Sequence, residues 1–292
     1  MPELRIWRNE QCHGDIEVRL KTTPMIDNKG KNALIFGVRN NSSIAWAIAN
    51  KLMESGCNIA LSVEQTNLPT VEKMTKGLEM NVMGCDIRME KDIQNLVTTL
   101  QRNWGHIDYL LHGVAYGNHK VMCSTPPGVK GEAPKFIDIP FEDFMDSFNI
   151  SAFSLMRICK LCRPLLMENA SVLTLTYQAG QKVFPGYAGM AINKAALENM
   201  VKYLAWFFGE SAVRVNAISA GLIMTTSAGG IKGVRKLRKI GRQSAPLGNA
   251  SVDDVANGAL YYFSDLSKGV TGNIHFVDGG LNIMAIAGEQ DV

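Results

Sequence analysis

The chain has 292 residues, 46% of them hydrophobic, which is enough apolar sequence for one large α/β domain with a sizeable core. Its formal net charge of +3, with both signs spread along the sequence, argues against a protein built to bind nucleic acid. No run of about 18 apolar residues is present, so neither a membrane span nor a membrane partner is expected.

The first 27 residues are predicted to be a polar extension ahead of a single domain at 28–292. They contain acidic residues and no apolar core, which argues against a secretory signal or a transit peptide. Six cysteines, scattered through apolar segments of a chain too large to need disulfides, suit the cytoplasm. Because Met25 directly precedes the domain, we expect either a natural start there or a dispensable arm at 1–24.

Short apolar, β-branched runs alternate with amphipathic stretches through the whole domain. Strands that are apolar throughout are buried on both faces, and helical crossovers join parallel neighbours. The pattern therefore predicts a doubly wound, Rossmann-like α/β domain with a seven-stranded parallel sheet and helices on both faces. The expected strands are 33–37, 58–63, 81–85, 108–113, 171–176, 213–219 and 274–279.

The first strand-to-helix turn is where such a sheet binds nucleotide phosphates. Gly37 ends the strand, Val38 follows it, and Ser43 and Ile44 begin a helix whose N–H groups and dipole favour an anion. The usual GxGxxG is absent, so an ordinary helix cap at Ser43 explains the segment about as well.

Acidic residues follow the second and third strands. Glu64 could accept hydrogen bonds from adenosine ribose hydroxyls and would repel a 2′-phosphate, which favours NADH over NADPH. Arg39 in the phosphate turn favours the opposite, since a guanidinium binds a 2′-phosphate as well as a pyrophosphate. Asp86 and its neighbour Ile87 would contact adenine, although Asp86 could also cap the helix expected from Glu90.

Cys159 and Cys162 are spaced as CxxC inside a helical pattern. No second pair or matching histidine spacing completes a zinc site, so no metal is expected. Buried cysteines are the simpler interpretation, and a redox dithiol is the alternative.

Two tyrosines and a lysine follow the fifth expected strand. Tyr177 lies ten residues before Tyr187, and Lys194 lies seven after it. At about 100° per residue, seven residues bring a helical side chain back within roughly 20° of the same face, so Tyr187 and Lys194 should face one ligand. A nearby ammonium lowers the pKa of a phenol, and its other donors could hold a nicotinamide ribose. The simpler alternative is a tyrosine at a helix start and a solvated lysine.

The turn GVRNNSSIA, the run VRVNAISAG, the closing VTGNIHFVDGG and this Tyr–Lys pair together resemble short-chain dehydrogenases. Most of that superfamily has a gap of four between the two residues. The gap of seven, with a second tyrosine ten residues earlier, is similar to the NADH-dependent enoyl-[acyl-carrier-protein] reductases of bacterial type II fatty-acid synthesis. The resemblance covers roughly residues 28–285.

The resemblance implies an enzyme that reduces the double bond of trans-2-enoyl thioesters carried by acyl carrier protein. It implies Tyr187 as the donor to the thioester oxygen, Lys194 as the anchor of the nicotinamide ribose, and Tyr177 on the substrate side. The implied nicotinamide contacts are Gly113, Val114, Ala115, Ile223, Thr225 and Thr226, and the implied acyl contacts are Gly117 and Met190. Gly113 departs from the serine common in that family, and Leu222 departs from the usual proline.

The long connection 222–250 contains a basic run, IKGVRKLRKIGR, without an acid. Such a run is either a solvated helix face or a docking surface for acidic acyl carrier protein and its phosphopantetheine phosphate. In the resembled family this segment is the substrate-binding loop. That family is typically homotetrameric, and we expect the subunit contact at the last helix and strand.

Two other functions stay open from the residues alone. A carbonyl or 3-oxoacyl reductase is disfavoured by the missing four-residue gap between tyrosine and lysine. A non-catalytic dinucleotide-binding protein would need the same scaffold without the chemistry.

Overall fold

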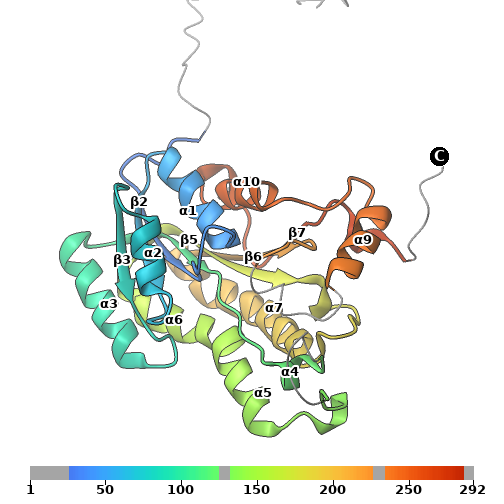
Figure 1. Ribbon diagram of the computed structural model, residues 1–292. Coiled ribbons are helices and arrows are strands. Elements are labelled where there is room, and N and C mark those ends of the chain that lie inside the picture. The colour runs from blue at the N-terminus through green and yellow to red at the C-terminus, as the bar shows by residue number, and fades with distance from the viewer. Residues whose placement is uncertain (1–25, 125–131, 226–233, 286–292) are drawn as a thin grey trace, which may run out of the picture.

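A parallel β-sheet lies at the centre of the computed structural model, which describes residues 26–124, 132–225 and 234–285 (Figure 1). Within these ranges the sheet has seven strands in the order β3-β2-β1-β4-β5-β6-β7, and every neighbouring pair is parallel. This confirms the predicted fold class. The strands are β1 (Asn32–Phe36), β2 (Asn58–Val63), β3 (Met80–Gly84), β4 (Ile107–His112), β5 (Leu166–Tyr177), β6 (Arg214–Ala220) and β7 (Ile274–Val277).

The strands begin and end within two residues of the predicted positions, with one exception. The structure starts β5 at Leu166 rather than at 171. Leu166 pairs with Ile107, and a register shift then separates that pair from the rest of the β4–β5 ladder. Glu168 and Asn169, between the two paired stretches, interrupt the apolar pattern, which is why the prediction started the strand later.

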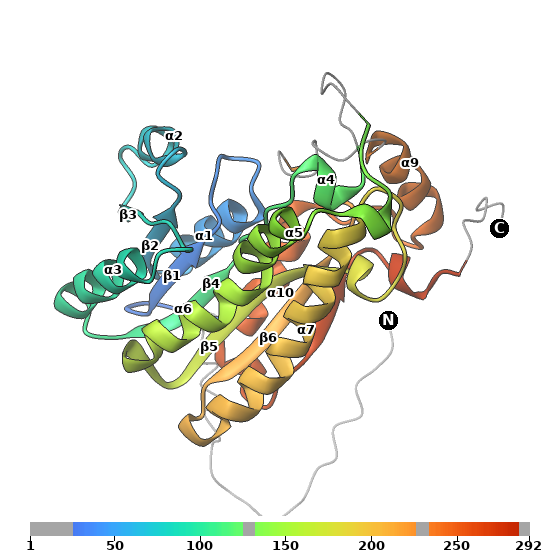
Figure 2. The same cartoon turned by 90° about the horizontal axis from the view of Figure 1, so that it is seen from below.

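Helices cover both faces of the sheet (Figures 1 and 2). One face is covered by α3, α6 and α7, which lie side by side and pack on alternate strand residues such as Leu34 and Phe36. The other face is covered by α1 and α10, which pack on Ala33 and Ile35. The described helices are α1 (Ile44–Glu54), α2 (Leu68–Met74), α3 (Glu90–Asn103), α4 (His119–Met122), α5 (Phe141–Phe148), α6 (Ser154–Cys162), α7 (Ala188–Phe208), α9 (Val234–Ser244) and α10 (Val252–Tyr262).

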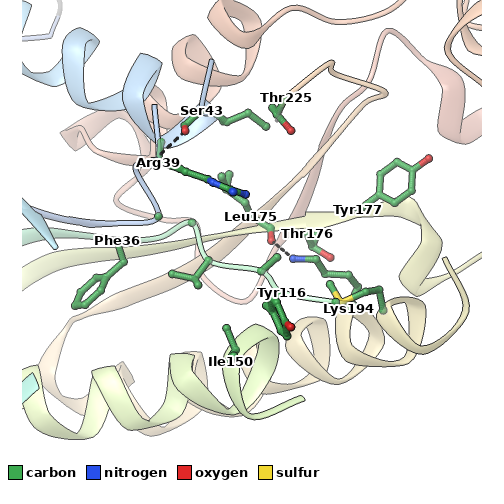
Figure 3. Close-up of a pocket in the computed structure, with 18 of the residues that line it drawn as sticks. Phe36, Arg39, Ser43, Tyr116, Ile150, Leu175, Thr176, Tyr177, Lys194 and Thr225 are labelled. Carbon is green, nitrogen blue, oxygen red and sulfur yellow. Dashed lines mark hydrogen bonds between the residues drawn. The ribbon is translucent and has the colours of Figure 1, made fainter. Parts of the chain in front are cut away.

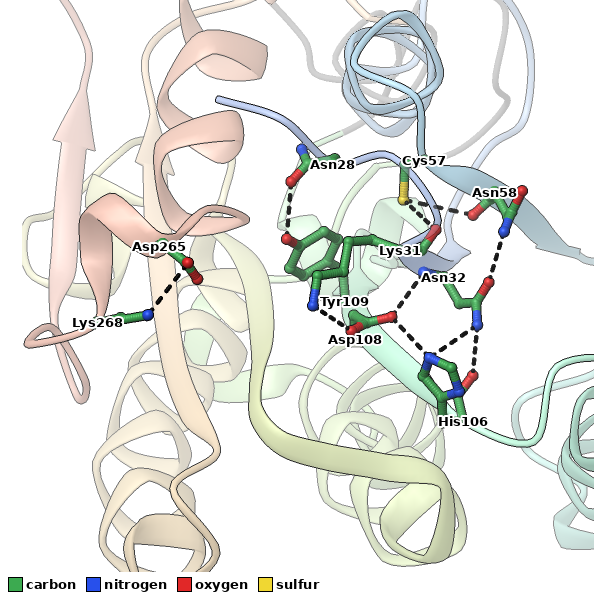
Figure 4. Close-up of polar contacts among 10 residues, drawn as sticks. All are labelled: Asn28, Lys31, Asn32, Cys57, Asn58, His106, Asp108, Tyr109, Asp265 and Lys268. Carbon is green, nitrogen blue, oxygen red and sulfur yellow. Dashed lines mark hydrogen bonds and ion pairs between the residues drawn. The ribbon is translucent and has the colours of Figure 1, made fainter. Parts of the chain in front are cut away.

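A polar network joins the amino-terminal ends of β1, β2 and β4 (Figure 4). Asp108 accepts hydrogen bonds from Lys31 Nζ (2.9 Å) and from the backbone N–H of Asn32 (2.8 Å). Asn58 Nδ2 donates to Asn32 Oδ1 (2.9 Å), and Tyr109 Oη donates to Asn28 Oδ1 (2.9 Å). Because Asn28, Asn32, Asp108 and Tyr109 are buried and paired, the network holds the three strand starts in register while the opposite ends stay available for a ligand.

The CxxC pair lies in α6, inside the apolar core against α3 and the sheet. Both side chains are fully buried, and burial raises the pKa of the Cys159 thiol to about 12 and that of Cys162 still further from its ordinary value. Thiols held protonated and away from solvent are unreactive. The structure therefore confirms the prediction that these are buried cysteines and disfavours a redox dithiol. In the described part of the chain no cluster of His, Cys, Asp and Glu could hold a metal ion.

The predicted extension lies, except for its last two residues, outside the described ranges, so the hypothesis about residues 1–24 stays a prediction. Across the described residues, no helix combines the length and apolar composition that crossing a membrane requires. The cytoplasmic location also stays a prediction from the cysteine pattern.

Candidate active site

A cavity of about 820 Å³ opens at the carboxyl ends of the strands, where a doubly wound sheet binds its ligands (Figure 3). Seventeen of the predicted site residues line it, and the eighteenth, Thr226, lies outside the described residues. The seventeen are Gly37, Val38, Ser43, Ile44, Glu64, Asp86, Ile87, Gly113, Val114, Ala115, Gly117, Tyr177, Tyr187, Met190, Lys194, Ile223 and Thr225. The sequence thus predicted which residues share one cavity, and the role of each stays a prediction.

The turn after β1 needs glycine for two reasons. Gly37 has φ +102°, a conformation that side-chain-bearing residues rarely adopt. A Cβ at this position would also overlap the carbonyl oxygen of Gly113, which follows β4. The backbone N–H of Gly113 donates to the carbonyl oxygen of Phe36 (3.0 Å), so the ends of β1 and β4 are tied together at the floor of the cavity.

Ser43 stands at the N-cap position of α1, but its side chain does not cap the helix. Its Oγ accepts hydrogen bonds from the backbone N–H groups of Arg39 and Asn40, both at 3.1 Å. The predicted N-cap position is confirmed, but the hydroxyl folds the preceding turn instead of bonding to the helix. The first N–H groups of α1 are left without a side-chain acceptor from Ser43 at the wall of the cavity, which is the arrangement that favours an anion.

Acidic side chains line the cavity beyond β2 and β3. Glu64 accepts from Asn67 Nδ2 at 3.0 Å at the exposed rim. Asp86 pairs with Arg88, whose Nη2 lies 2.7 Å from Asp86 Oδ2 and whose Nε donates to Oδ1 at 3.0 Å. The Arg88 guanidinium lowers the pKa of Asp86 and competes for the oxygens that would accept from adenine. The alternative that Asp86 caps α3 is wrong, since Met89 occupies the N-cap position.

Lys194 is 5% exposed, and its Nζ donates to the carbonyl oxygen of Leu175 at 2.8 Å (Figure 3). Burial lowers its pKa to about 8, against the opposing charge of Glu198. Tyr187 precedes α7 as its N-cap residue, and burial raises the pKa of its phenol to about 12. The predicted lowering of the phenol pKa by the lysine is therefore wrong for this structure, because the ammonium is directed at Leu175 and desolvation of the phenolate dominates.

The two tyrosines belong to one aromatic wall. The ring centroids of Tyr177 and Tyr187 are 5.3 Å apart in an edge-to-face arrangement, and Phe184 packs on Tyr177 at 5.0 Å. Tyr177 ends β5, and burial raises its pKa above the ordinary value as well. Both phenols thus stay protonated at neutral pH and can donate hydrogen bonds.

The segment after β4 is held by residues that the sequence analysis did not single out. Ser147 Oγ and Ser151 Oγ donate to the carbonyl oxygen of Tyr116 at 2.6 and 2.9 Å, and Asn193 Nδ2 donates to Ser147 Oγ at 2.8 Å. A Cβ on Gly117 would lie 2.7 Å from Met190 Cγ, so a larger residue there would displace the Met190 side chain. These contacts join segments more than thirty residues apart in the sequence, and no local motif marks them.

Helix α9 carries the described part of the basic run beside the cavity. Leu237 lines the cavity, while Lys236, Arg238, Lys239 and Arg242 are exposed. Leu222 also lines the cavity, and a Cβ on Gly241 would lie 2.6 Å from its Cδ1. The leucine that departs from the usual proline therefore packs against α9.

Comparison with known proteins gives consistent matches. The family model for enoyl-(acyl carrier protein) reductase matches residues 37–282. The chain is 40% identical over 263 residues to the NADH-dependent enoyl-[acyl-carrier-protein] reductase FabI of Rickettsia typhi, which covers 88% of this chain and 95% of that protein. It is 37% identical to such a reductase of Rhizobium meliloti, over 88% of this chain and 92% of that protein.

Solved structures of the same kind superpose on the chain. The reductase of Anaplasma phagocytophilum, in complex with NAD, has a TM-score of 0.82 and 33% identity, covering 89% of this chain and 97% of that one. The Bacillus cereus reductase, with NADP+ and an indole naphthyridinone, has a TM-score of 0.83 and 33% identity, covering 90% and 100%. The NADH enzyme of Aquifex aeolicus has a TM-score of 0.81 and 33% identity, covering 88% and 98%.

The Gly37 turn is tested by two alanine substitutions that differ in one respect. Gly37 and Gly30 both have positive φ, but a Cβ on Gly30 meets nothing within 4 Å. Each substitution should cost about 1–2 kcal/mol of folding free energy from backbone strain. Only Gly37→Ala should also push β1 from β4, and we expect it to raise the Kd for NADH, measured by fluorescence titration, about tenfold or more. Equal NADH affinity in the two variants would contradict this role of Gly37.

Proposed function

The chain belongs to the enoyl-(acyl carrier protein) reductase family, and from this premise we propose which of its side chains carry the reaction. The protein reduces the carbon–carbon double bond of trans-2-enoyl-acyl-carrier-protein thioesters with NADH, the last reductive step of each fatty-acid elongation cycle. The carbonyl-reductase and non-catalytic alternatives are thereby set aside. The observation that supports the assignment of roles is that one cavity joins the Gly37 turn to Lys194, Tyr177 and Tyr187.

The donors and acceptors of the cavity fit NADH. The N–H groups at the start of α1 suit the pyrophosphate, and the Glu64 carboxylate suits the adenosine ribose hydroxyls while opposing a 2′-phosphate. Lys194 uses one of its three donors on Leu175, so the other two can serve the hydroxyls of the nicotinamide ribose. When bound, NADH supplies the hydride that is added to the β-carbon of the enoyl thioester.

Tyr187 is the proposed hydrogen-bond donor to the thioester oxygen. Addition of hydride at the β-carbon drives negative charge onto that oxygen, and a positioned hydroxyl stabilises it in the transition state. Because burial holds the pKa of Tyr187 at about 12, the phenol still carries its proton when the charge develops. The partly buried setting strengthens this interaction, since less water screens it.

Tyr177 is proposed to shape the acyl side of the site. Its ring packs against both Phe184 and Tyr187, which favours a fixed wall of the site over a mobile acid. Met190 and Gly117 line the same cavity and lie close together, and their packing would set the space left for the acyl chain. Tyr187 then acts on the thioester, and Tyr177 positions the chain.

Replacing Tyr187 with Phe removes the proposed donor with little change in shape. We expect kcat, followed by the loss of NADH absorbance with dodecenoyl thioester, to fall about 10²–10³-fold. The Kd for NADH should stay within about twofold, since the cofactor contacts are left in place. Tyr203→Phe, the same change on α7 at a residue that does not line the cavity, is the matched control; it keeps the aromatic ring and should leave kcat unchanged. An unchanged kcat in Tyr187→Phe would remove Tyr187 from the mechanism.

The exposed cations of α9 are proposed as the docking surface for acyl carrier protein. Lys236, Arg238, Lys239 and Arg242 stand on a helix whose Leu237 lines the cavity, so positive charge lies at its edge. The described helix contains no acidic residue. A local patch of one sign attracts an acidic carrier at long range without a large net charge on the whole protein.

The combined variant Arg238→Glu and Arg242→Glu tests this docking surface. We expect the KM for enoyl-acyl-carrier-protein to rise about tenfold or more, because two attractive charges become repulsive. The KM for the enoyl thioester of N-acetylcysteamine, which carries no carrier protein and no phosphate, should change little. Lys76→Glu with Lys91→Glu, exposed cations near α2 and on α3, is the matched control. Equal effects on both substrates would contradict docking at α9.

The assembly is proposed to be a homotetramer. Strand β7 is an edge of the sheet, and an edge strand offers unpaired backbone groups to a neighbour. On α7, Tyr203, Trp206 and Phe207 are exposed, with Trp206 at 79%, which is unusual for large apolar side chains without a partner. Sedimentation equilibrium should therefore give four chains per particle, and a monomer would contradict the proposal.

A further inference from the structure

A buried carboxylate lies one helical turn beyond Lys194. Glu198 is 6% exposed and is not among the residues that line the cavity. Its Oε1 accepts a hydrogen bond from Thr176 Oγ1 at 2.8 Å, and its Oε2 accepts from Gln181 Nε2 at 2.8 Å. A buried carboxylate is costly to keep, and here both oxygens are paired with neutral donors rather than with a cation.

The end of β5 holds Lys194 and Glu198 together. The carbonyl oxygen of Leu175 accepts from Lys194 (Figure 3). The hydroxyl of the next residue, Thr176, donates to Glu198. The turn after β5 packs directly on this part of α7, because a Cβ on Gly180 would lie 3.0 Å from Ala195 N and 3.1 Å from Glu198 Oε1. Ammonium and carboxylate are therefore fixed to two successive residues of one strand.

The other titratable groups around Lys194 carry no compensating charge. His112 of β4 is fully buried between Thr174 Oγ1 (2.9 Å) and Ser154 Oγ (2.8 Å), and burial with the nearby lysine charge lowers its pKa to about 3, so it is neutral. Burial keeps the phenols of Tyr177 and Tyr187 protonated. Among the described residues, Glu198 is thus the negative group that acts on Lys194.

We propose that Glu198 is a positioning residue, which keeps the Lys194 ammonium charged and in place for the nicotinamide ribose of NADH. This inference rests on the role proposed above for Lys194. Burial lowers the pKa of Lys194, and the negative charge of Glu198 raises it. Together they leave this pKa at about 8, which is close to physiological pH. Removing the negative charge lowers this pKa further, so the ammonium is lost at a lower pH.

The test is Glu198→Gln, which removes the charge but keeps the length and an oxygen that can accept from Thr176. Gln181 can turn its amide to pair with the new amide, so the local hydrogen bonds can persist. In the cofactor-free protein, the titration of Lys194 followed by its ¹³Cε resonance, assigned from its loss in Lys194→Arg, should move down by about one pH unit. The Kd for NADH should rise about fivefold at pH 8 and stay at the wild-type value at pH 6.

Two further variants keep the outcome interpretable. Glu198→Asp retains the charge and should leave most of the Lys194 titration at its wild-type position. Glu198→Met, which also removes the charge, serves in place of Glu198→Gln if that variant does not fold. Glu168→Gln, the same substitution at an exposed position near the other end of β5, should change neither measurement. An NADH affinity that falls equally at pH 6 and pH 8, or an unmoved Lys194 titration in Glu198→Gln, would overturn the inference.

A separate variant, Lys194→Met, tests the role proposed for Lys194 itself. If Lys194→Met binds NADH as tightly as the wild type at pH 6, the role proposed for Lys194 is wrong, whatever Glu198 does. If Lys194→Met binds NADH weakly while Glu198→Gln leaves the Lys194 titration in place, the role of Lys194 stands and the role of Glu198 is refuted.

Discussion

The close approach of β1 and β4 is the constraint on which the site depends. The sheet order changes direction between these strands, and helices leave toward opposite faces, so a crevice must open at their carboxyl ends. The bottom of this crevice is fixed because the backbones of Gly37 and Gly113 lie in close contact, and the N–H of Gly113 donates to the carbonyl oxygen of Phe36. The turn after β1, which leads into α1, and the segment that leads from β4 to Tyr116 both start at that contact.

Burial then sets the chemistry at the other end of the cavity, and it has opposite consequences for two neighbouring groups. For Tyr187 it raises the pKa to about 12, which suits a hydrogen-bond donor. For Lys194 it lowers the pKa to about 8, which endangers the charge that its proposed role requires. A dry site therefore needs a counter-charge for the lysine that does not reach the phenol, and Glu198, a turn further along α7 and outside the cavity wall, meets both conditions.

The sequence predicted what local patterns and topology determine. Apolar β-branched runs located the strands, and the rule that parallel strands end at one edge brought Glu64, Asp86 and Lys194 into one cavity. The predictions from sequence were wrong where tertiary packing decides which partner a side chain binds. The Ser43 hydroxyl binds its own turn, Asp86 binds Arg88, and the lysine ammonium turns to a strand carbonyl, none of which spacing encodes.

The charged groups that could attract a partner and the group proposed to act on the substrate lie in different parts of the site. At the rim, the exposed cations of α9 and the carboxylate of Glu64 are the groups proposed to act on charged partners, where water screens them and where attraction costs little desolvation. At the end of the cavity where the reaction is proposed, Lys194 carries the charge and Glu198 lies behind it, while the proposed donor to the thioester is the neutral phenol of Tyr187. A carrier protein can thus be attracted by long-range charge while the transition state meets one preorganised donor, so recognition and chemistry can change independently.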